Sequence, residues 1–191
     1  MIKRYAALLA LAVSFLAAGN GLAGDFKIDN VHSSVIFSVK HMGVGVAYGR
    51  FNKFEGQINY DPANPTGASF NVTIHTESID SGNERRDGHL KNTDFFNAVE
   101  FPTATFKSTK IEQGDGKTLK VSGDLTILGV TKPYTFHMTD LGQADARGKT
   151  MQAWHGEGSI KRSDFGMNYG IDNGALGDEV KLIFSLETKN G

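Results

Sequence analysis

The sequence predicts an all-β fold, an eight-stranded antiparallel β-barrel with a short helix in one long connection. Apolar and polar side chains alternate with a period of two in segment after segment, which is typical of half-buried strands. Glycine accounts for 23 of the 191 residues, which indicates many turns and close backbone approaches. Cysteine is absent, so the fold must be held by its core, and thiol chemistry and thiolate metal sites are excluded.

Residues 1–23 are predicted to form a signal peptide. Lys3 and Arg4 give a positive start, an apolar run over residues 6–18 is too short to span a bilayer, and small residues lead up to a cleavage site after Ala23. The mature chain, residues 24–191, is then one domain located in the periplasm. It contains no further stretch apolar enough for a transmembrane segment. An uncleaved N-terminal anchor is the alternative.

Eight segments of the mature chain carry the alternation. In the first, Val35, Phe37 and Val39 share one face, while Ser38 and Lys40 take the other. The eight are residues 35–40, 54–60, 70–75, 104–111, 119–127, 134–138, 151–161 and 180–187, with 104–111 and 151–161 the weaker two. An open sheet of this size leaves two edges that invite aggregation, and closure into a barrel removes them. A two-sheet sandwich is the alternative architecture.

Two connections are too long for hairpins. Residues 78–100 contain Ser81-Gly82-Asn83-Glu84, which has the spacing of a capping box, so a short helix is expected there. Residues 163–178 carry four glycines with Met167 and Tyr169 among them, which is typical of a compact surface loop. Each connection is a candidate lid; the alternative is that each plugs an end of the barrel.

Charge and motif spacing favour neither nucleic-acid binding nor catalysis. Without Lys3 and Arg4 the 20 basic side chains become 18, against 21 acidic ones, and no basic block stands out. The six histidines include no pair at the i, i+4 spacing of a helical metal site, so no metal is expected. Residues 156–160 (GEGSI) lack the flanking glycine pattern of a serine elbow, and residues 43–48 lack the third glycine of a dinucleotide loop. No catalytic residue is therefore predicted.

The apolar side chains supply more aromatic bulk than a tightly filled small barrel requires, so many of them are expected to line a slot for an apolar ligand. Filling the core is the alternative role for each. His41 continues the inward parity of Phe37 and Val39 and could bind a ligand head at the barrel mouth, or it is a structural histidine. The candidate ligand-binding residues are Phe37, Val39, His41, Arg50, Phe51, Phe54, Phe70, Val72, Phe106, Leu125, Phe136, Trp154, Leu182 and Phe184.

Several segments in combination resemble the YceI family of bacterial secreted proteins, over essentially the whole mature chain. They are residues 32–41 (HSSVIFSVKH), 49–56 (GRFNKFEG), 86–96 (RDGHLKNTDFF), 101–102 (FP), 123–127 (GDLTI), 129–133 (GVTKP), 162–167 (RSDFGM) and 177–180 (GDEV). The resemblance implies a lipocalin-like barrel whose pocket takes a long-chain apolar lipid, a polyprenyl chain or an isoprenoid quinone, commonly as a homodimer. For Asp87 and Asp94, which match the family pattern, a structural role is expected.

The leading functional hypothesis is a periplasmic binding or carrier protein for a long-chain isoprenoid lipid, without catalysis and without a further cofactor. One alternative is an enzyme acting on such a lipid, which would need a histidine and a carboxylate converging in the pocket. Another is a stress-response protein that acts through a protein partner, which an interior filled by its own aromatic side chains would favour.

Overall fold

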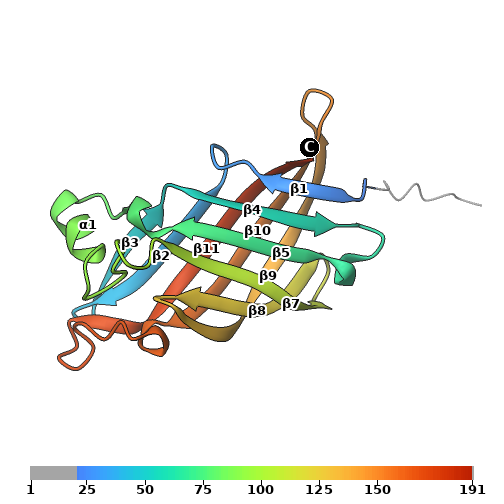
Figure 1. The fold of residues 1–191 in the computed structure, drawn as a ribbon. Coiled ribbons are helices and arrows are strands. Elements are labelled where there is room, and N and C mark those ends of the chain that lie inside the picture. The colour runs from blue at the N-terminus through green and yellow to red at the C-terminus, as the bar shows by residue number, and fades with distance from the viewer. Residues whose placement is uncertain (1–20, 191) are drawn as a thin grey trace, which may run out of the picture.

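A computed structural model describes residues 21–190, which are built almost entirely from antiparallel strands (Figure 1). Residues 1–20 of the predicted signal peptide lie outside this part. The strands are β1 (Gly24–Ile28), β2 (Ser34–His41), β3 (Gly45–Phe51), β4 (Phe54–Tyr60), β5 (Ser69–His75), β6 (Ile79–Asp80), β7 (Thr103–Gln113), β8 (Thr118–Ile127), β9 (Val130–Asp145), β10 (Thr150–Lys161) and β11 (Leu176–Asn190). The α-helix α1 (Glu84–Leu90) and 3-10 turns at Pro65–Gly67, Thr76–Ser78 and Arg162–Phe165 complete the described elements.

The strands close into an eight-membered ring, as predicted. The first half of β11 pairs with β2 and its last residues pair with β1, so β1 and β2 form one interrupted barrel strand. β3 pairs with β2 and β4 pairs with β1, so these two form the next one. β5 with the short β6, and then β7, β8, β9, β10 and β11, complete the ring. The barrel rather than the sandwich is therefore the architecture.

The interruptions are held by side chains that replace the missing ladder hydrogen bonds. The Asn30 amide donates to the carbonyl oxygen of Asn52 (3.1 Å) and accepts from the backbone N–H of Phe54 (2.9 Å), which joins the β1–β2 break to the β3–β4 break. The Asp29 carboxylate binds Lys189 of β11 and His32. The chain thus bends at these two breaks without leaving the ring.

The predicted alternation places the apolar face of each strand inside the barrel. On β8, for example, Leu119, Val121 and Leu125 are buried, while Lys120 and Asp124 are exposed. Phe26, Ile58 and Trp154, which belong to one buried cluster, fill the end of the barrel that carries β1 and the last residues of β11. The core is therefore dense at one end, and the other end remains for a cavity.

Two long connections lie at the other end of the barrel, on the left in Figure 1. β6 pairs with β3 alone among the described strands, and residues 81–102, including α1, occupy the space between β6 and the start of β7. The helix begins after Asn83, whose side chain caps the N–H of Arg86 (3.0 Å). The expected cap at Ser81 is thus corrected: that residue binds the Asp87 carboxylate instead. None of the described helices has the length and apolar character needed to cross a membrane.

Candidate binding cavity

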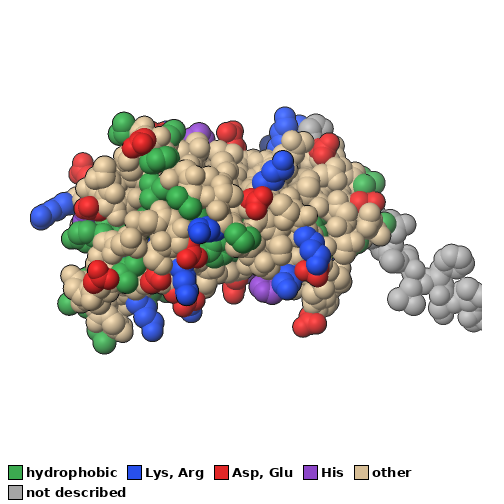
Figure 2. Space-filling model, turned by 60° about the horizontal axis from the view of Figure 1, so that its bottom comes forward, with side chains coloured by type: hydrophobic (Ala, Val, Ile, Leu, Met, Phe, Trp, Pro, Cys, Tyr) green, Lys and Arg blue, Asp and Glu red, His purple; other side chains and the backbone are tan. Residues whose placement is uncertain are grey.

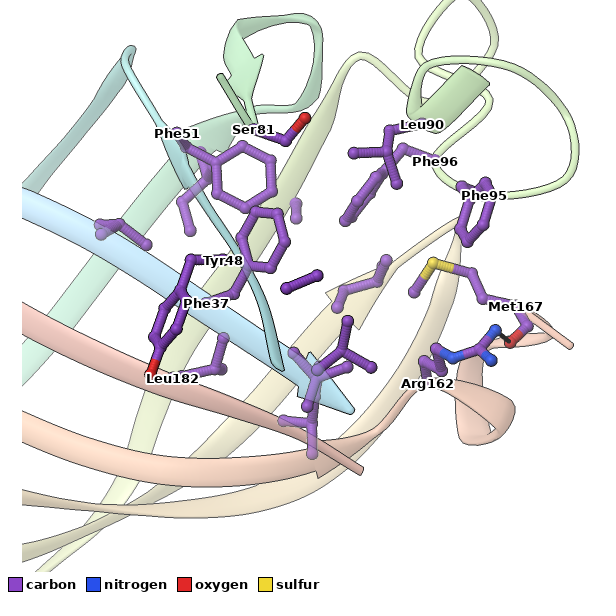
Figure 3. A pocket seen from close by; sticks show the side chains of 18 of the residues that line it. Phe37, Tyr48, Phe51, Ser81, Leu90, Phe95, Phe96, Arg162, Met167 and Leu182 are labelled. Carbon is purple, nitrogen blue, oxygen red and sulfur yellow. Dashed lines mark hydrogen bonds between the residues drawn. The ribbon is translucent and has the colours of Figure 1, made fainter. Parts of the chain in front are cut away.

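The interior of the barrel contains a cavity of about 820 Å³ that opens at the end carrying α1 and the 166–175 loop (Figure 3). Its volume is in the range of small-molecule sites. The lining runs along β11 from Leu176 to Leu186, eleven residues, which corresponds to a path of roughly 33 Å along the strand. The cavity is therefore long and suits an extended ligand.

Apolar side chains form the wall at every depth. Near the bottom it is made by Val35, Phe70, Val121, Met138 and Leu186, and halfway up by Phe106, Phe136 and Phe184. The three phenylalanine rings contact one another edge to face, with centroids 5.1 Å apart for Phe106 and Phe136 and 5.3 Å for Phe136 and Phe184. Such contacts fix the rings against the wall.

Glycines on neighbouring strands provide the space in which these rings lie. A Cβ atom on Gly158 would come within 2.4 Å of the Phe136 ring, and one on Gly156 would come within 2.2 Å of the Met138 sulfur. Each large side chain therefore lies flat over a glycine instead of projecting across the barrel. Part of the high glycine content is explained by these close approaches, and they keep the cavity open.

The floor of the cavity is an aromatic layer backed by a polar cluster. Trp154 is fully buried and packs edge to face against Tyr60 and Phe70, with centroids 4.6 Å and 5.2 Å away. Behind it, the Tyr60 hydroxyl donates to Asp140 (2.8 Å), and so does the buried Gln152 amide (2.6 Å). Burial and the neighbouring Asp140 carboxylate raise the pKa of Tyr60, so the phenol stays a donor. The cavity is thereby closed at this end.

The polar side chains of the lining gather at the mouth. They are His41, Tyr48, Ser81, Arg86, His89, Arg162 and Tyr169, and no carboxylate belongs to the lining in the described residues. Asp87 and Asp94 stand behind this layer: Asp87 accepts from Ser81, and Asp94 is 2.8 Å from Nε2 of His89. This agrees with the structural role expected for the two aspartates. The mouth therefore presents mainly hydrogen-bond donors to a ligand head.

Arg162 holds the connection between β10 and β11 at the mouth. Its guanidinium is almost fully buried and donates to the carbonyl oxygens of Gly177 (2.8 Å), Met167 (2.7 Å) and Leu176 (3.2 Å). Burial raises the pKa of Asp178, but the hydrogen bonds from Ser163 and the charge of Arg162 outweigh it and lower the pKa overall. The loop is thus fixed at both ends by charged groups.

Eleven of the fourteen candidate ligand-binding residues line the cavity. Three do not. Arg50 lies exposed on the outer face of β3, opposite Asp80, so it is not placed for a ligand head inside the barrel. Phe54 is buried in the wall beside Ile74, its partner on β5, without joining the lining, and Trp154 lies beneath the floor. The strand parity of Trp154 was correct, but its depth along the barrel takes it out of the cavity.

Sequence reasoning missed the lining residues of the two connections. His89 and Phe95, from the segment around α1, both contact Tyr169 of the 166–175 loop, with ring centroids 4.9 Å and 5.4 Å apart. Phe96 adds an edge-to-face contact with Phe51 at 5.4 Å. The two candidate lids therefore meet over the mouth. No periodic pattern marks these residues, and aromatic residues within polar, glycine-rich loops were the available signal.

No group of His, Asp and Glu side chains within residues 21–190 has the arrangement of a metal site. His41 lines the cavity mouth, where its parity predicted it, and is exposed. His75 and His155 lie 3.7 Å and 3.2 Å from Glu55 and Glu157 and are partly exposed. A ligand contact through His41 remains a prediction.

The fold and the cavity define a lipocalin-like barrel with an open apolar interior. The chain belongs to the YceI family, since the YceI-like domain matches residues 26–188. It is 41% identical over 182 residues to protein YceI of Escherichia coli O157:H7, with 94% of each chain covered, and 40% identical over 190 residues to a UPF0312 protein of Pseudomonas paraeruginosa, with 98% of each covered.

Solved structures show the same fold. The crystal structure of BcnA from Burkholderia cenocepacia matches with a TM-score of 0.77 and 32% identity, over 84% of this chain and 98% of that one. A polyisoprenoid-binding domain from Saccharophagus degradans, implicated in plant cell wall breakdown, matches with a TM-score of 0.68 over 87% and 98% of the two chains. Its identity is 16%, so this likeness shows the fold alone.

Proposed function

We propose that the protein binds a long-chain polyisoprenoid lipid in its cavity and carries it in the periplasm. The observation that carries the proposal is the long apolar cavity, closed by the Trp154 layer and open at one end. Each buried carbon of a prenyl chain contributes roughly 0.8 kcal/mol gross, so several isoprene units offset the entropy lost when a flexible chain is ordered. The polyisoprenoid-binding domain of Saccharophagus degradans, with the same fold, supports this ligand class.

Binding without chemistry is part of the proposal. A reaction on the lipid would need an acid or base beside the reacting atoms. The His89–Asp94 pair is at the rim of the mouth, and the described lining deeper inside offers only apolar side chains and backbone. The YceI family is itself a binding-domain fold, which supports a carrier over an enzyme.

The ligand is identified by mass spectrometry of the mature protein purified from the periplasm under native conditions, followed by solvent extraction. We expect one prenyl chain or isoprenoid quinone per barrel. The same preparation gives the mass of the intact particle, for which we propose a homodimer. Protein that is correctly folded yet carries no lipid, and that takes up none when offered prenyl lipids, would reject the carrier function.

A matched pair of variants on β11 locates the lipid. Phe184 faces the cavity, and its neighbour Ile183 faces outwards on the same strand. We expect Phe184→Asp to abolish lipid binding, because a carboxylate in the apolar wall is strongly disfavoured beside a prenyl chain. Ile183→Asp should retain binding. Unchanged binding in folded Phe184→Asp would remove Phe184 from the site.

A further inference from the structure

Four large apolar side chains stand exposed on the turn between β2 and β3 and on the adjoining half of β3. They are Met42, Val44, Val46 and Tyr48, with 63%, 94%, 53% and 60% of their surface exposed, and we call them the hairpin tip. Figure 2 shows hydrophobic side chains gathered at the left end of the molecule, the end that carries this turn in Figure 1. Single exposed apolar residues are common, but a contiguous group marks an interaction surface.

The geometry of the turn does not require apolar side chains at these positions. Met42 and Gly43 both have positive φ, 51° and 72°, as in the tight turn that favours Asn, Asp or Gly at its centre. Met42 therefore holds a backbone conformation that an apolar residue rarely adopts. Its N–H donates to the carbonyl oxygen of Ala175 (2.9 Å), which fixes the turn against the 166–175 loop. The hairpin tip is thus held in place outside the barrel.

The hairpin tip is continuous with the cavity. Val46 and Tyr48 belong both to the exposed apolar group and to the lining of the cavity mouth. His41 and Leu176 are their neighbours in that lining. A hydrocarbon chain leaving the cavity would meet this apolar surface before it met water. The hairpin tip is therefore placed for the passage of the ligand.

The charge around the hairpin tip indicates what it touches. Residues 38–49, which form the turn and the strand ends beside it, contain no Asp or Glu, whereas they contain Lys40 and His41. The whole chain has a formal net charge of −1, so this segment is positive against a slightly acidic background. Apolar side chains beside a cation are the pattern of a surface that lies on anionic phospholipid.

We propose that the hairpin tip docks the mouth of the cavity onto an anionic phospholipid bilayer, so that the prenyl lipid passes between membrane and barrel without crossing water. The inference rests on the proposed function and adds its partner. Met42, Val44 and Tyr48 enter the boundary between headgroups and acyl chains, while Lys40, beside the turn, faces the phosphates.

Vesicle flotation tests the docking. We expect the mature protein to float with vesicles of phosphatidylcholine mixed with phosphatidylglycerol, and much less with phosphatidylcholine alone. Val44→Asp should weaken vesicle binding about tenfold, because it places a carboxylate among acyl chains and phosphates. Leu141→Asp is the matched control, since Leu141 is 59% exposed on β9 near the opposite end of the barrel and should leave flotation unchanged.

A second variant tests the contribution of positive charge to vesicle binding. Lys40→Gln should lower binding to the anionic vesicles about fivefold and make the remaining binding less sensitive to salt. Absence of flotation on either vesicle, or equal flotation of Val44→Asp and wild-type protein, would overturn the proposal. A dimer that becomes monomeric in Val44→Asp, by sedimentation, while vesicle binding stays unchanged, would also overturn it and assign the hairpin tip to a subunit interface.

The docking proposal and the carrier proposal can be rejected independently of each other. In Val44→Asp, the equilibrium affinity for a short prenyl alcohol in solution should match that of the wild type, while transfer of the lipid from vesicles slows about tenfold, in line with the loss of docking. A wild-type protein that binds the alcohol but does not float retains the proposed function and loses this inference. A protein that floats but never binds the alcohol loses the carrier function.

Discussion

Gly49 lies directly beneath the ring of Phe37 on the neighbouring strand. The two residues are paired across β2 and β3, and a Cβ atom on Gly49 would come within 2.2 Å of the Phe37 ring, closer than any real contact. Phe37 therefore lies flat on the wall of the cavity because its partner has no side chain. Phe106 lies over Gly123 in a similar way, although Gly123 pairs with Ser108: a Cβ atom on Gly123 would come within 2.7 Å of the Phe106 ring.

The variant Gly49→Ala tests whether these glycines keep the cavity open. The added methyl group must turn the Phe37 ring away from the wall, and the free direction is into the cavity, which has an open interior there. We expect the affinity for a prenyl lipid to fall at least about tenfold, and the free energy of unfolding to fall by about 1–3 kcal/mol. Titration calorimetry and urea unfolding measure the two quantities.

Gly88→Ala is the control for this variant. Gly88 lies in α1, and a Cβ atom there meets nothing within 4 Å, so alanine should be neutral or slightly stabilising in the helix. If Gly49→Ala binds lipid as tightly as the wild type, the Phe37 ring can adopt another conformation that leaves the cavity open. The glycine is then not needed for the shape of the cavity.

Arg162→Lys should loosen the loop that borders the mouth. A lysine ammonium cannot reach the three carbonyl oxygens of Met167, Leu176 and Gly177 that the guanidinium joins. We expect the free energy of unfolding to fall by about 2–4 kcal/mol, because buried acceptors lose their donors. Hydrogen exchange of the backbone amides of residues 166–177 should accelerate more than that of β8.

The exposed neighbour Lys161 supplies the comparison for this loop. Lys161→Gln removes a positive charge from the same chain segment without touching the buried carbonyl oxygens, and it should change neither stability nor exchange. Equal exchange rates in Arg162→Lys and the wild type would mean that the loop is held by the packing of Phe165 and Met167 rather than by the arginine.

Most of the barrel could be predicted because the alternation of apolar and polar residues indicates which face of a strand is buried. Each of the eight predicted segments corresponds to a different strand of the ring. β1 and β3 were missed because each is one half of an interrupted strand. β1 has five residues, too few for a clear pattern, and the inward positions of β3 carry Gly45, Ala47 and Gly49 before a single large apolar residue, Phe51.

The cavity lining could be predicted only in part. The alternation along a strand shows which face of the sheet a side chain points to, but not how deep in the barrel that side chain lies. Phe70 and Trp154 both point inwards, yet one ring lines the cavity and the other lies under its floor. The depth depends on how far each strand is shifted against the next, which the alternation does not contain. Residues such as Phe95 and Tyr169 reach the mouth from irregular connections, where no period applies.

Asp29 should make the stability of the barrel depend on pH. Its carboxylate binds Lys189 of β11 and His32, and these two hydrogen bonds are the main reason why its pKa is lowered in the folded protein. In the unfolded chain an aspartate titrates near 3.9. The folded protein therefore binds fewer protons between the two pKa values, so the contribution of Asp29 is complete above the unfolded pKa and is lost as pH falls through the folded one.

We expect Asp29→Asn to lower the free energy of unfolding by about 1–2 kcal/mol at neutral pH, because the charge-assisted bond to Lys189 is lost while the N–H of Val31 can still donate to the amide oxygen. The difference from the wild type should shrink once the pH falls below about 4, because the wild-type carboxylate then becomes protonated on unfolding. Urea unfolding at a series of pH values measures it, with exposed Asp172→Asn as the control that should leave the profile unchanged. A difference that stays constant down to pH values near 3 would mean that the stabilisation does not depend on the charge, and that Asp29 holds the β1–β2 break by its shape alone.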